Sequence, residues 1–93
     1  MRTVKRTAQF RRDFKRVKRS VHRGHVDATL LAVLELLAVD SPLPARYVDH
    51  PMKGEYDDCR DCHLRPDLVL VYRKRSADVL ELVRIGTHAQ LAL

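Results

Sequence analysis

No run of apolar residues approaches the roughly 18 residues of a membrane-spanning helix, so no transmembrane segment is expected. The basic N-terminal segment lacks the apolar run of a signal peptide, which favours the cytoplasm and no membrane partner. Disorder is also disfavoured, because 45% of the residues are hydrophobic and recur periodically. A chain of 93 residues can bury one modest core. The sequence therefore predicts a single domain over residues 1–93.

Cysteine is scarce: Cys59 and Cys62 are the only two, and they form one C-x-x-C motif. In a cytosolic protein this motif suggests a redox pair or half of a zinc site. Here it lies in a strand-like segment, where residues three apart face opposite sides of a sheet. That geometry disfavours both a disulfide and chelation. We expect no metal and no cofactor, with zinc bound by the cysteines and histidines as the minor alternative.

Acidic residues are nearly missing from the N-terminal quarter, where Asp13 alone opposes a dense run of lysine and arginine. Across the chain, 18 Lys and Arg against 12 Asp and Glu give a net charge of +6. A cationic element of this density favours a polyanionic partner, either nucleic acid or an acidic protein. The alternative is a solvated helix face that only keeps the protein soluble.

Apolar periodicity predicts two helices in the N-terminal half. After a short strand over residues 2–6, Thr7 can cap a helix that ends at His22-Arg23-Gly24, with Gly24 as a left-handed cap. Its apolar stripe is formed by Phe10, Phe14, Val17 and Val21. A second, more apolar helix begins at residue 26 or 27 and stops at residues 40–42. The short connection predicts an antiparallel helical hairpin.

Three strands are predicted in the C-terminal half. Residues 56–64 alternate imperfectly, residues 68–72 are continuously apolar as in a central strand, and residues 79–85 form the last strand. A proline-containing loop over residues 43–54 precedes them, and residues 88–93 form a short tail. The predicted fold is α+β with the order β-α-α-β-β-β, in which the helical hairpin packs on a small, largely antiparallel sheet.

Titratable groups gather between Asp49 and Asp67 and again at the end of the last strand. They comprise three imidazoles, two carboxylates and one guanidinium, from His50, His63, His88, Asp61, Asp67 and Arg60. Histidine titrates near neutral pH and can donate or accept a proton, and arginine matches phosphate oxygens bidentately. Each residue alone has a bland structural explanation. Together they indicate a site that cleaves phosphodiester bonds in RNA.

The same stretch carries a family resemblance. The chain resembles the YafQ-like branch of the RelE/ParE superfamily, the toxins of type II toxin–antitoxin modules. The matching residues are Leu43-Pro44-Ala45, Tyr47, Asp49-His50-Pro51, Gly54, Tyr56, Arg60-Asp61, His63, Pro66-Asp67, Leu70, Tyr72 and Gly86-Thr87-His88-Ala89. One departure is Ala92, since the family often has an aromatic residue near its C-terminus.

The resemblance implies a ribosome-dependent mRNA endonuclease that cuts translated message in the A site of the 70S ribosome. It also implies a small cognate antitoxin that neutralises the toxin. The positions that match functional ones are His50, His63, Asp67 and His88, with His88 as the proton donor.

On that basis we expect His88 to act as general acid and Asp67 or His50 as base. His63 would orient Asp67 or share protons with it, and Arg60 and Arg84 would steady the phosphate. The basic helix would dock on ribosomal RNA through Arg12, Arg16 and Arg19 and could be covered in part by an acidic antitoxin segment. Two other functions compete with this one: a ParE-like toxin that inhibits a protein such as DNA gyrase, and a passive basic module that binds RNA or the ribosome.

Overall fold

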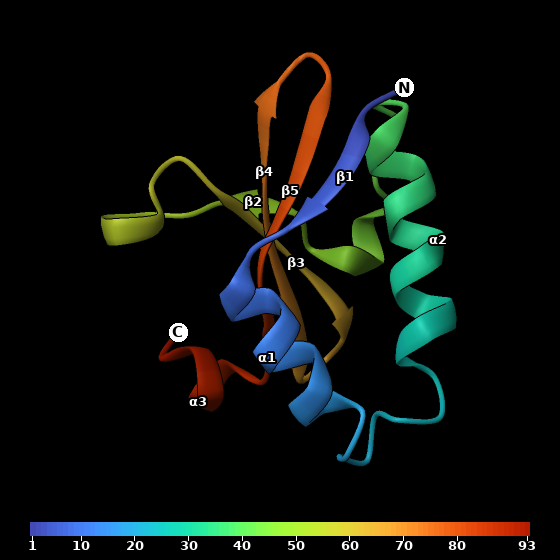
Figure 1. The fold of residues 1–93 in the computed structure, drawn as a ribbon, viewed down its shortest axis with the longest axis vertical. Helices are drawn as coiled ribbons and strands as arrows, with labels where there is room; N and C mark the ends of the chain where they lie inside the picture. Colours follow the sequence, from blue (N-terminus) through green and yellow to red (C-terminus); the bar gives the residue numbers. More distant parts are fainter.

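The fold is built on five strands in the spatial order β1-β5-β4-β3-β2 (Figure 1). The computed structural model describes residues 1–93. Strand β1 runs parallel to β5, and every other pairing is antiparallel. The elements in chain order are β1 (Thr3–Arg6), α1 (Ala8–Val17), α2 (Val26–Ala38), η1 (Ala45–Tyr47), β2 (His50–Pro51), η2 (Gly54–Tyr56), β3 (Arg60–Arg65), β4 (Leu68–Ser76), β5 (Val79–Gly86) and α3 (His88–Leu91). The predicted α+β order is confirmed, with β2 and the short helices added to it.

Helices α1 and α2 run in opposite directions over one face of the sheet, which we call the helix face (Figure 1). They bury Phe10 and Val17 from α1 and Val26, Leu30, Val33 and Leu37 from α2. The sheet contributes alternate residues of its strands to this core, since side chains two apart on a strand share a face. These sheet residues are Cys62, Leu64, Leu68, Leu70, Tyr72, Leu80, Leu82 and Ile85.

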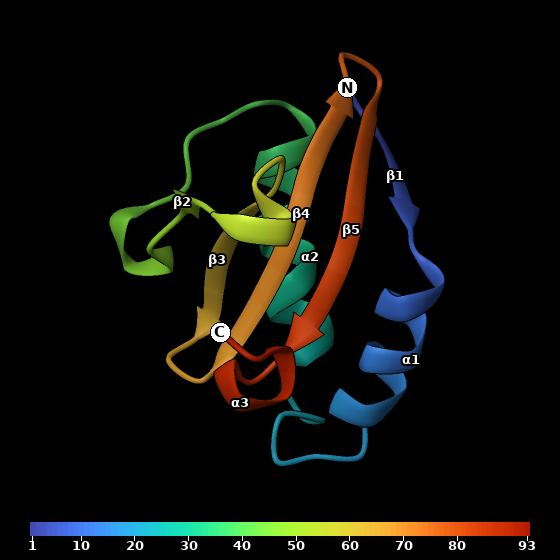
Figure 2. The same cartoon turned by 90° about the vertical axis from the view of Figure 1, so that its left-hand side faces the viewer.

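The opposite face, which we call the site face, has a smaller cluster made of Cys59, Val69, Val71, Val83 and Leu91. In Figure 2 α3 lies on this side of the sheet and α2 lies behind it. Strand β4 is therefore covered on both sides, as its continuous apolar run predicts. No helix is long and apolar enough to cross a membrane.

The first helix is shorter than predicted. Thr7 caps it as expected, because its side chain accepts a hydrogen bond from Phe10 N. The helix ends at Val17, whose carbonyl accepts from both the backbone N–H of Ser20 at 3.0 Å and the Ser20 hydroxyl at 2.7 Å. Val21 consequently leaves the stripe and is 87% exposed. The prediction that Gly24 is a left-handed cap is also wrong, since Gly54 is the glycine with positive φ.

The strand predicted over residues 56–64 begins only at Arg60. Gly54 adopts φ +74, a left-handed conformation that favours glycine, and it starts the turn η2 that takes up Tyr56. The tail predicted after residue 87 is instead α3. Thr87 and Gln90 form a capping box, in which each side chain bonds the backbone of the other. The T-x-x-Q spacing was the signal for this helix.

Candidate active site

Three histidines converge on the carboxyl group of Asp61 on the site face. Asp61 and His63 share this face because they lie two apart on β3. His50 comes from β2, which pairs with β3 so that His50 lies opposite Asp61. His88 is the first residue of α3. Its ring packs edge-on against His63, with ring centroids 5.0 Å apart.

The pair of His50 and Asp61 holds one proton between two atoms. His50 Nδ1 lies 2.8 Å from the Val48 carbonyl, which can only accept, so Nδ1 carries a proton. His50 Nε2 lies 3.2 Å from Asp61 Oδ1. That approach needs a second proton, either on Nε2 or on the carboxyl, because two lone pairs would repel. The pair therefore holds a proton that either member can carry.

Burial changes the acidity of the Asp61 carboxyl group. Asp61 is only 6% exposed, and its Oδ1 forms no hydrogen bond, with His50 Nε2 as its ionic neighbour. Burial raises the pKa of Asp61, because it disfavours the charged form, while His50, His63 and His88 act in the opposite direction. From the sequence, Asp61 belongs to the titratable cluster but has no individual catalytic role. Its position two residues before His63 was the available signal.

Asp67 lies apart from the histidine cluster. It belongs to the turn between β3 and β4, and its side chain is 66% exposed. The expected contact with His63 is replaced by one with His22, whose Nε2 lies 3.3 Å from Asp67 Oδ1. His50 lies opposite Asp61, before His63 on β3, whereas Asp67 follows the end of β3, so His63 lies between them in the order along this strand.

Arg60 and Arg84, the two expected phosphate ligands, lie on different faces of the sheet. Arg60 lies opposite Tyr72, whose side chain is part of the helix-face cluster, and pairs there with Asp49 through Nη2 at 3.2 Å. The Tyr72 hydroxyl donates to the same carboxylate at 2.5 Å. Arg60 therefore anchors the loop that presents His50, and its expected role in steadying the phosphate stays a prediction.

Arg84 does share the site face, in the cross-strand row formed with Asp61 and Val71. Its Nε lies 2.6 Å from Oδ2 of the buried Asp13 on α1. Hydrogen bonding to Asp13 raises the pKa of Arg84, so the guanidinium stays charged. The same Asp13 oxygen accepts from Ile85 N at 3.2 Å, which satisfies the edge of β5 beyond the end of β1.

A groove of about 730 Å³ runs along the free edge of β3 and reaches the cluster at His63. Strand β2 pairs only with Arg60 and Asp61, so the rest of this edge has no neighbouring strand. Arg46 and Arg65 line the groove, and the Arg46 guanidinium stacks over the Tyr47 ring at 4.8 Å. Neither arginine was singled out from the sequence, because both belong to loop or strand-end positions without a distinguishing pattern.

The expected RNA-binding residues Arg12, Arg16 and Arg19 lie on and just after α1, and all three are exposed. They are remote from Asp61 in the fold, on an element that packs against the helix face. Arg12 bonds Gln9, and Arg16 lies 3.4 Å from Asp13. The structure thus places these three arginines on the element that packs against the helix face, and their contact with RNA stays a prediction.

The two cysteines are free and buried in different clusters, Cys59 on the site face and Cys62 on the helix face. Burial raises the pKa of Cys59 to about 11 and raises that of Cys62 as well, so both stay thiols at neutral pH. No group of three or more histidine, cysteine or carboxylate side chains is placed to hold a metal ion.

Comparison with known proteins adds a family match. Residues 2–93 match the family described as the bacterial toxin of type II toxin–antitoxin system, YafQ. The mRNA interferase toxin YafQ of Escherichia coli strain K12 is 36% identical over 92 residues, which cover 97% of this chain and 95% of the relative.

Two solved structures are also similar. The E. coli DinJ–YafQ complex contains a chain with a TM-score of 0.81 and 34% identity, covering 98% of both chains. A metal-bound toxin from Helicobacter pylori has a TM-score of 0.84 and 41% identity, covering 98% of this chain and 99% of that one.

Proposed function

The chain belongs to the YafQ family of bacterial toxins from type II toxin–antitoxin systems, and on this premise we propose that it is an mRNA interferase. It would cut translated messages in the ribosomal A site, in the cytoplasm, and thereby stop translation. The observation that carries the proposal is the set of three imidazoles around one buried carboxyl. A site with this many proton donors and acceptors suits acid–base cleavage of RNA.

The proposed reaction is attack of the RNA 2′-oxygen on the adjacent phosphorus. The new O–P bond forms as the bond to the departing 5′-oxygen breaks, which leaves a 2′,3′-cyclic phosphate and a 5′-hydroxyl. A base removes the 2′-hydroxyl proton and an acid protonates the 5′-oxygen. Each positioned proton transfer accelerates such a reaction by roughly a hundred- to ten-thousand-fold.

We assign His88 as the acid, because it begins α3 and contacts His63 rather than a carboxylate partner of its own. His63 then orients His88 and can replace its proton. Two groups qualify as the base: His50, which shares its proton with Asp61, and Asp67 on the other side of His63. The pH dependence of the His50→Gln and Asp67→Asn variants distinguishes them, since only the loss of the true base removes the acidic limb of the rate profile.

The message would lie in the groove along β3, with its scissile phosphate beside His63 and His88. Arg46 and Arg65 would then face the RNA backbone from the groove. Arg84 would stabilise charge on the site face, although Asp13 neutralises part of its field. Arginine suits these positions because its charge does not depend on pH.

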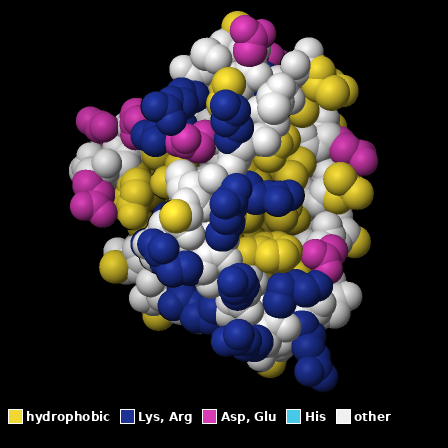
Figure 3. Space-filling view, viewed as in Figure 1, with side chains coloured by type: hydrophobic (Ala, Val, Ile, Leu, Met, Phe, Trp, Pro, Cys, Tyr) yellow, Lys and Arg dark blue, Asp and Glu magenta, His cyan; other side chains and the backbone are white.

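A second groove separates α1 from α2 and suits the cognate antitoxin. Its apolar floor consists of Phe10, Phe14, Leu30, Leu31 and Leu34, and its basic rim of Arg6, Arg11 and Lys15. Figure 3 shows this apolar area between basic side chains. An amphipathic, acidic segment matches both features. The antitoxin DinJ forms a complex with the E. coli relative.

The two sides of α1 would therefore have different partners. Arg11 and Lys15 face the groove, whereas Arg12, Arg16 and Arg19 are absent from its lining and remain for ribosomal RNA. A ParE-like inhibitor of gyrase or a passive binding module would need the basic surface alone. Neither alternative uses three histidines gathered around Asp61, and the family match favours the nuclease.

Primer extension on a defined message tests this function. Purified protein should produce discrete cuts only when programmed ribosomes are present, and His88→Ala should abolish them. The matched control is Glu35→Ala, which removes an exposed charged side chain of α2 outside the cluster. Intact message with folded protein, or cuts that persist in His88→Ala, would contradict the proposal.

A further inference from the structure

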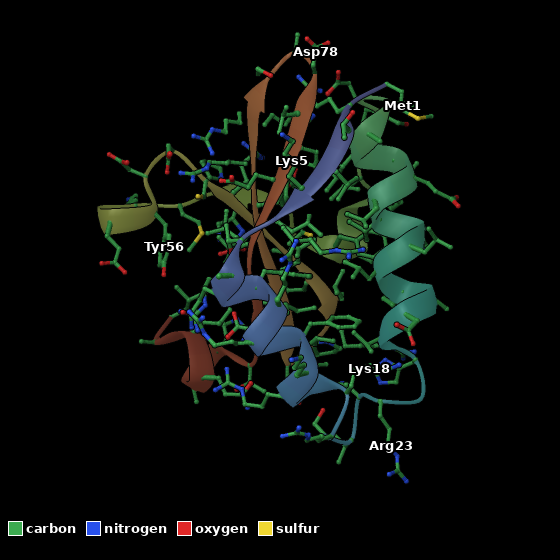
Figure 4. The ribbon with its side chains drawn as sticks, in the orientation of Figure 1. Met1, Lys5, Lys18, Arg23, Tyr56 and Asp78 are labelled. Atoms are coloured by element: carbon green, nitrogen blue, oxygen red, sulfur yellow. The ribbon has the colours of Figure 1, made fainter.

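His22 is a buried histidine that the reaction described above does not use. It lies in the connection between α1 and α2, residues 18–25, and is only 6% exposed. In Figure 4, Lys18 and Arg23 mark this connection at the far end of the two helices, and both side chains are exposed. His22 instead turns inward toward the turn between β3 and β4. A buried polar side chain among exposed neighbours needs a partner.

Both ring nitrogens of His22 have a polar neighbour. Nε2 lies 3.3 Å from Asp67 Oδ1, and Nδ1 lies 3.3 Å from His25 Nε2. The buried Nε2 forms no hydrogen bond in the structure, and the Asp67 carboxylate, 3.3 Å away, is the acceptor placed to receive one. Asp67 has no other ionic partner in the chain. The contact therefore joins two segments that are distant in sequence.

The Asp67 carboxylate determines which nitrogen carries the proton in His22 and then in His25. Ionised Asp67 can only accept, so His22 carries its proton on Nε2 and presents a bare Nδ1. His25 then donates from its Nε2. Burial lowers the pKa of His25, with Arg65 and His22 acting in the same direction and Asp67 opposing them. A neutral His25 has one proton, and this arrangement places it between the two rings.

This geometry is a line and not a metal site. The two nitrogens of His22 lie on opposite sides of the ring, so one faces His25 and the other faces Asp67. A single ion could not be reached by all three groups. A series of polar contacts between packed side chains limits the orientations that each of them can adopt.

We propose that His22, backed by His25, is a positioning residue that holds Asp67 for its part in RNA cleavage. This inference rests on the proposed function and names a residue that it lacks. An exposed aspartate would otherwise sample several rotamers, and misplacement by about 1 Å can cost roughly a hundredfold in rate. The contact with His22 limits that freedom.

Two substitutions separate hydrogen bonding from packing. His22→Gln can place an amide N–H near the position of Nε2, whereas His22→Leu fills the volume without a donor. In single-turnover cleavage on programmed ribosomes, His22→Leu should lower the rate constant about tenfold with little change in apparent affinity. His22→Gln should retain most of the activity. Equal loss in both variants would overturn the proposal.

A double-mutant cycle tests whether His22 acts through Asp67. Asp67→Ala should itself lower the rate, and adding His22→Leu should then cause no further loss. Losses that multiply would show that His22 acts elsewhere. Full activity of Asp67→Ala beside an inactive His88→Ala would overturn the positioning role while leaving the nuclease intact.

The contact between His22 and Asp67 can also be tested in the absence of RNA, independently of cleavage. Nitrogen-15 NMR of the histidine rings should show His22 with its proton on Nε2, and Asp67→Ala should shift that signal. Asp27→Ala, which removes an exposed carboxylate paired with Lys18 near the same connection, should not. A His22 signal unaffected by Asp67→Ala would overturn the inference. Failure of the wild type to cut message would overturn the proposed function instead, whatever the NMR result.

Discussion

Asp13→Ala should lower the free energy of unfolding by about 3 kcal/mol, because it breaks a buried ion pair. Asp13 is 3% exposed and accepts from Arg84 Nε at 2.6 Å, Arg84 Nη2 at 3.1 Å and Ile85 N at 3.2 Å. Removing one partner of such a pair costs about 3–5 kcal/mol. The Arg84 side chain is 17% exposed, so water can partly solvate it, which places the expected value at the lower end.

The assay is reversible denaturation by urea and by heat. A loss of about 3 kcal/mol corresponds to a fall in Tm of roughly 12–24 °C for a domain of this size. Asp27→Ala is the matched control, since its carboxylate is exposed and pairs with Lys18, and it should cost less than about 1 kcal/mol.

The double variant Asp13→Leu with Arg84→Met separates the charge from the packing. Replacing both members of a buried pair by apolar groups is often close to neutral, so this variant should be more stable than Asp13→Ala. A change below about 1 kcal/mol for Asp13→Ala, or a double variant less stable than the single one, would refute the assignment of this pair as a buried anchor of Arg84.

Three further predictions concern the site and its partners. Gly86→Ala would place a Cβ 2.9 Å from Gln90 Oε1, which should displace the Gln90 side chain from Thr87 N and weaken the capping box that orders α3 and His88; message cleavage should fall more than Tm does, and equal activity would contradict this. Burial raises the folded pKa of Asp61 above its unfolded value, so wild type should lose stability relative to Asp61→Asn as pH rises from about 4 to 7 in urea titrations; no trend with pH would contradict this. Charge reversal at Arg12, Arg16 and Arg19 should weaken ribosome binding and reduce its salt dependence, while antitoxin binding is retained. Charge reversal at Arg11 and Lys15 should instead weaken antitoxin binding and leave ribosome binding unchanged.

Much of the fold could be predicted because the relevant signals are local. Thr7 caps its helix, the apolar run from Leu68 marks the central strand, and the order of the main elements is confirmed. The end of the first helix could not be predicted from periodicity. Val21 continues the apolar stripe in sequence, but the Ser20 hydroxyl bonds the carbonyl of Val17 and ends the helix first.

The site was predictable in composition but not in its partnerships. His50, His63 and His88 meet as expected, and the carboxyl that joins them is Asp61. Which carboxylate meets which imidazole depends on register, because a shift of one residue exchanges the faces of a strand. The contact between His22 and Asp67 depends on the packing of two distant turns, which no local pattern encodes.

The proposed reaction site and the proposed antitoxin groove lie on opposite faces of the sheet. Asp61, His63 and Arg84 occupy the site face, whereas the groove between α1 and α2 lies over the helix face. Asp13 is the direct link between the two, since it belongs to α1 and holds Arg84. An antitoxin bound between the helices would therefore contact the element that anchors this arginine, without entering the histidine cluster.

The central claim is that this histidine cluster drives the RNA 2′-hydroxyl onto the neighbouring phosphorus. The most direct measurement is cleavage of a message with a single 2′-deoxynucleotide at the cut position, on programmed ribosomes, with mass analysis of the fragment ends. We expect the cut to disappear at the deoxy position and the all-ribose message to give a 2′,3′-cyclic phosphate. Undiminished cleavage of the deoxy message would contradict the account.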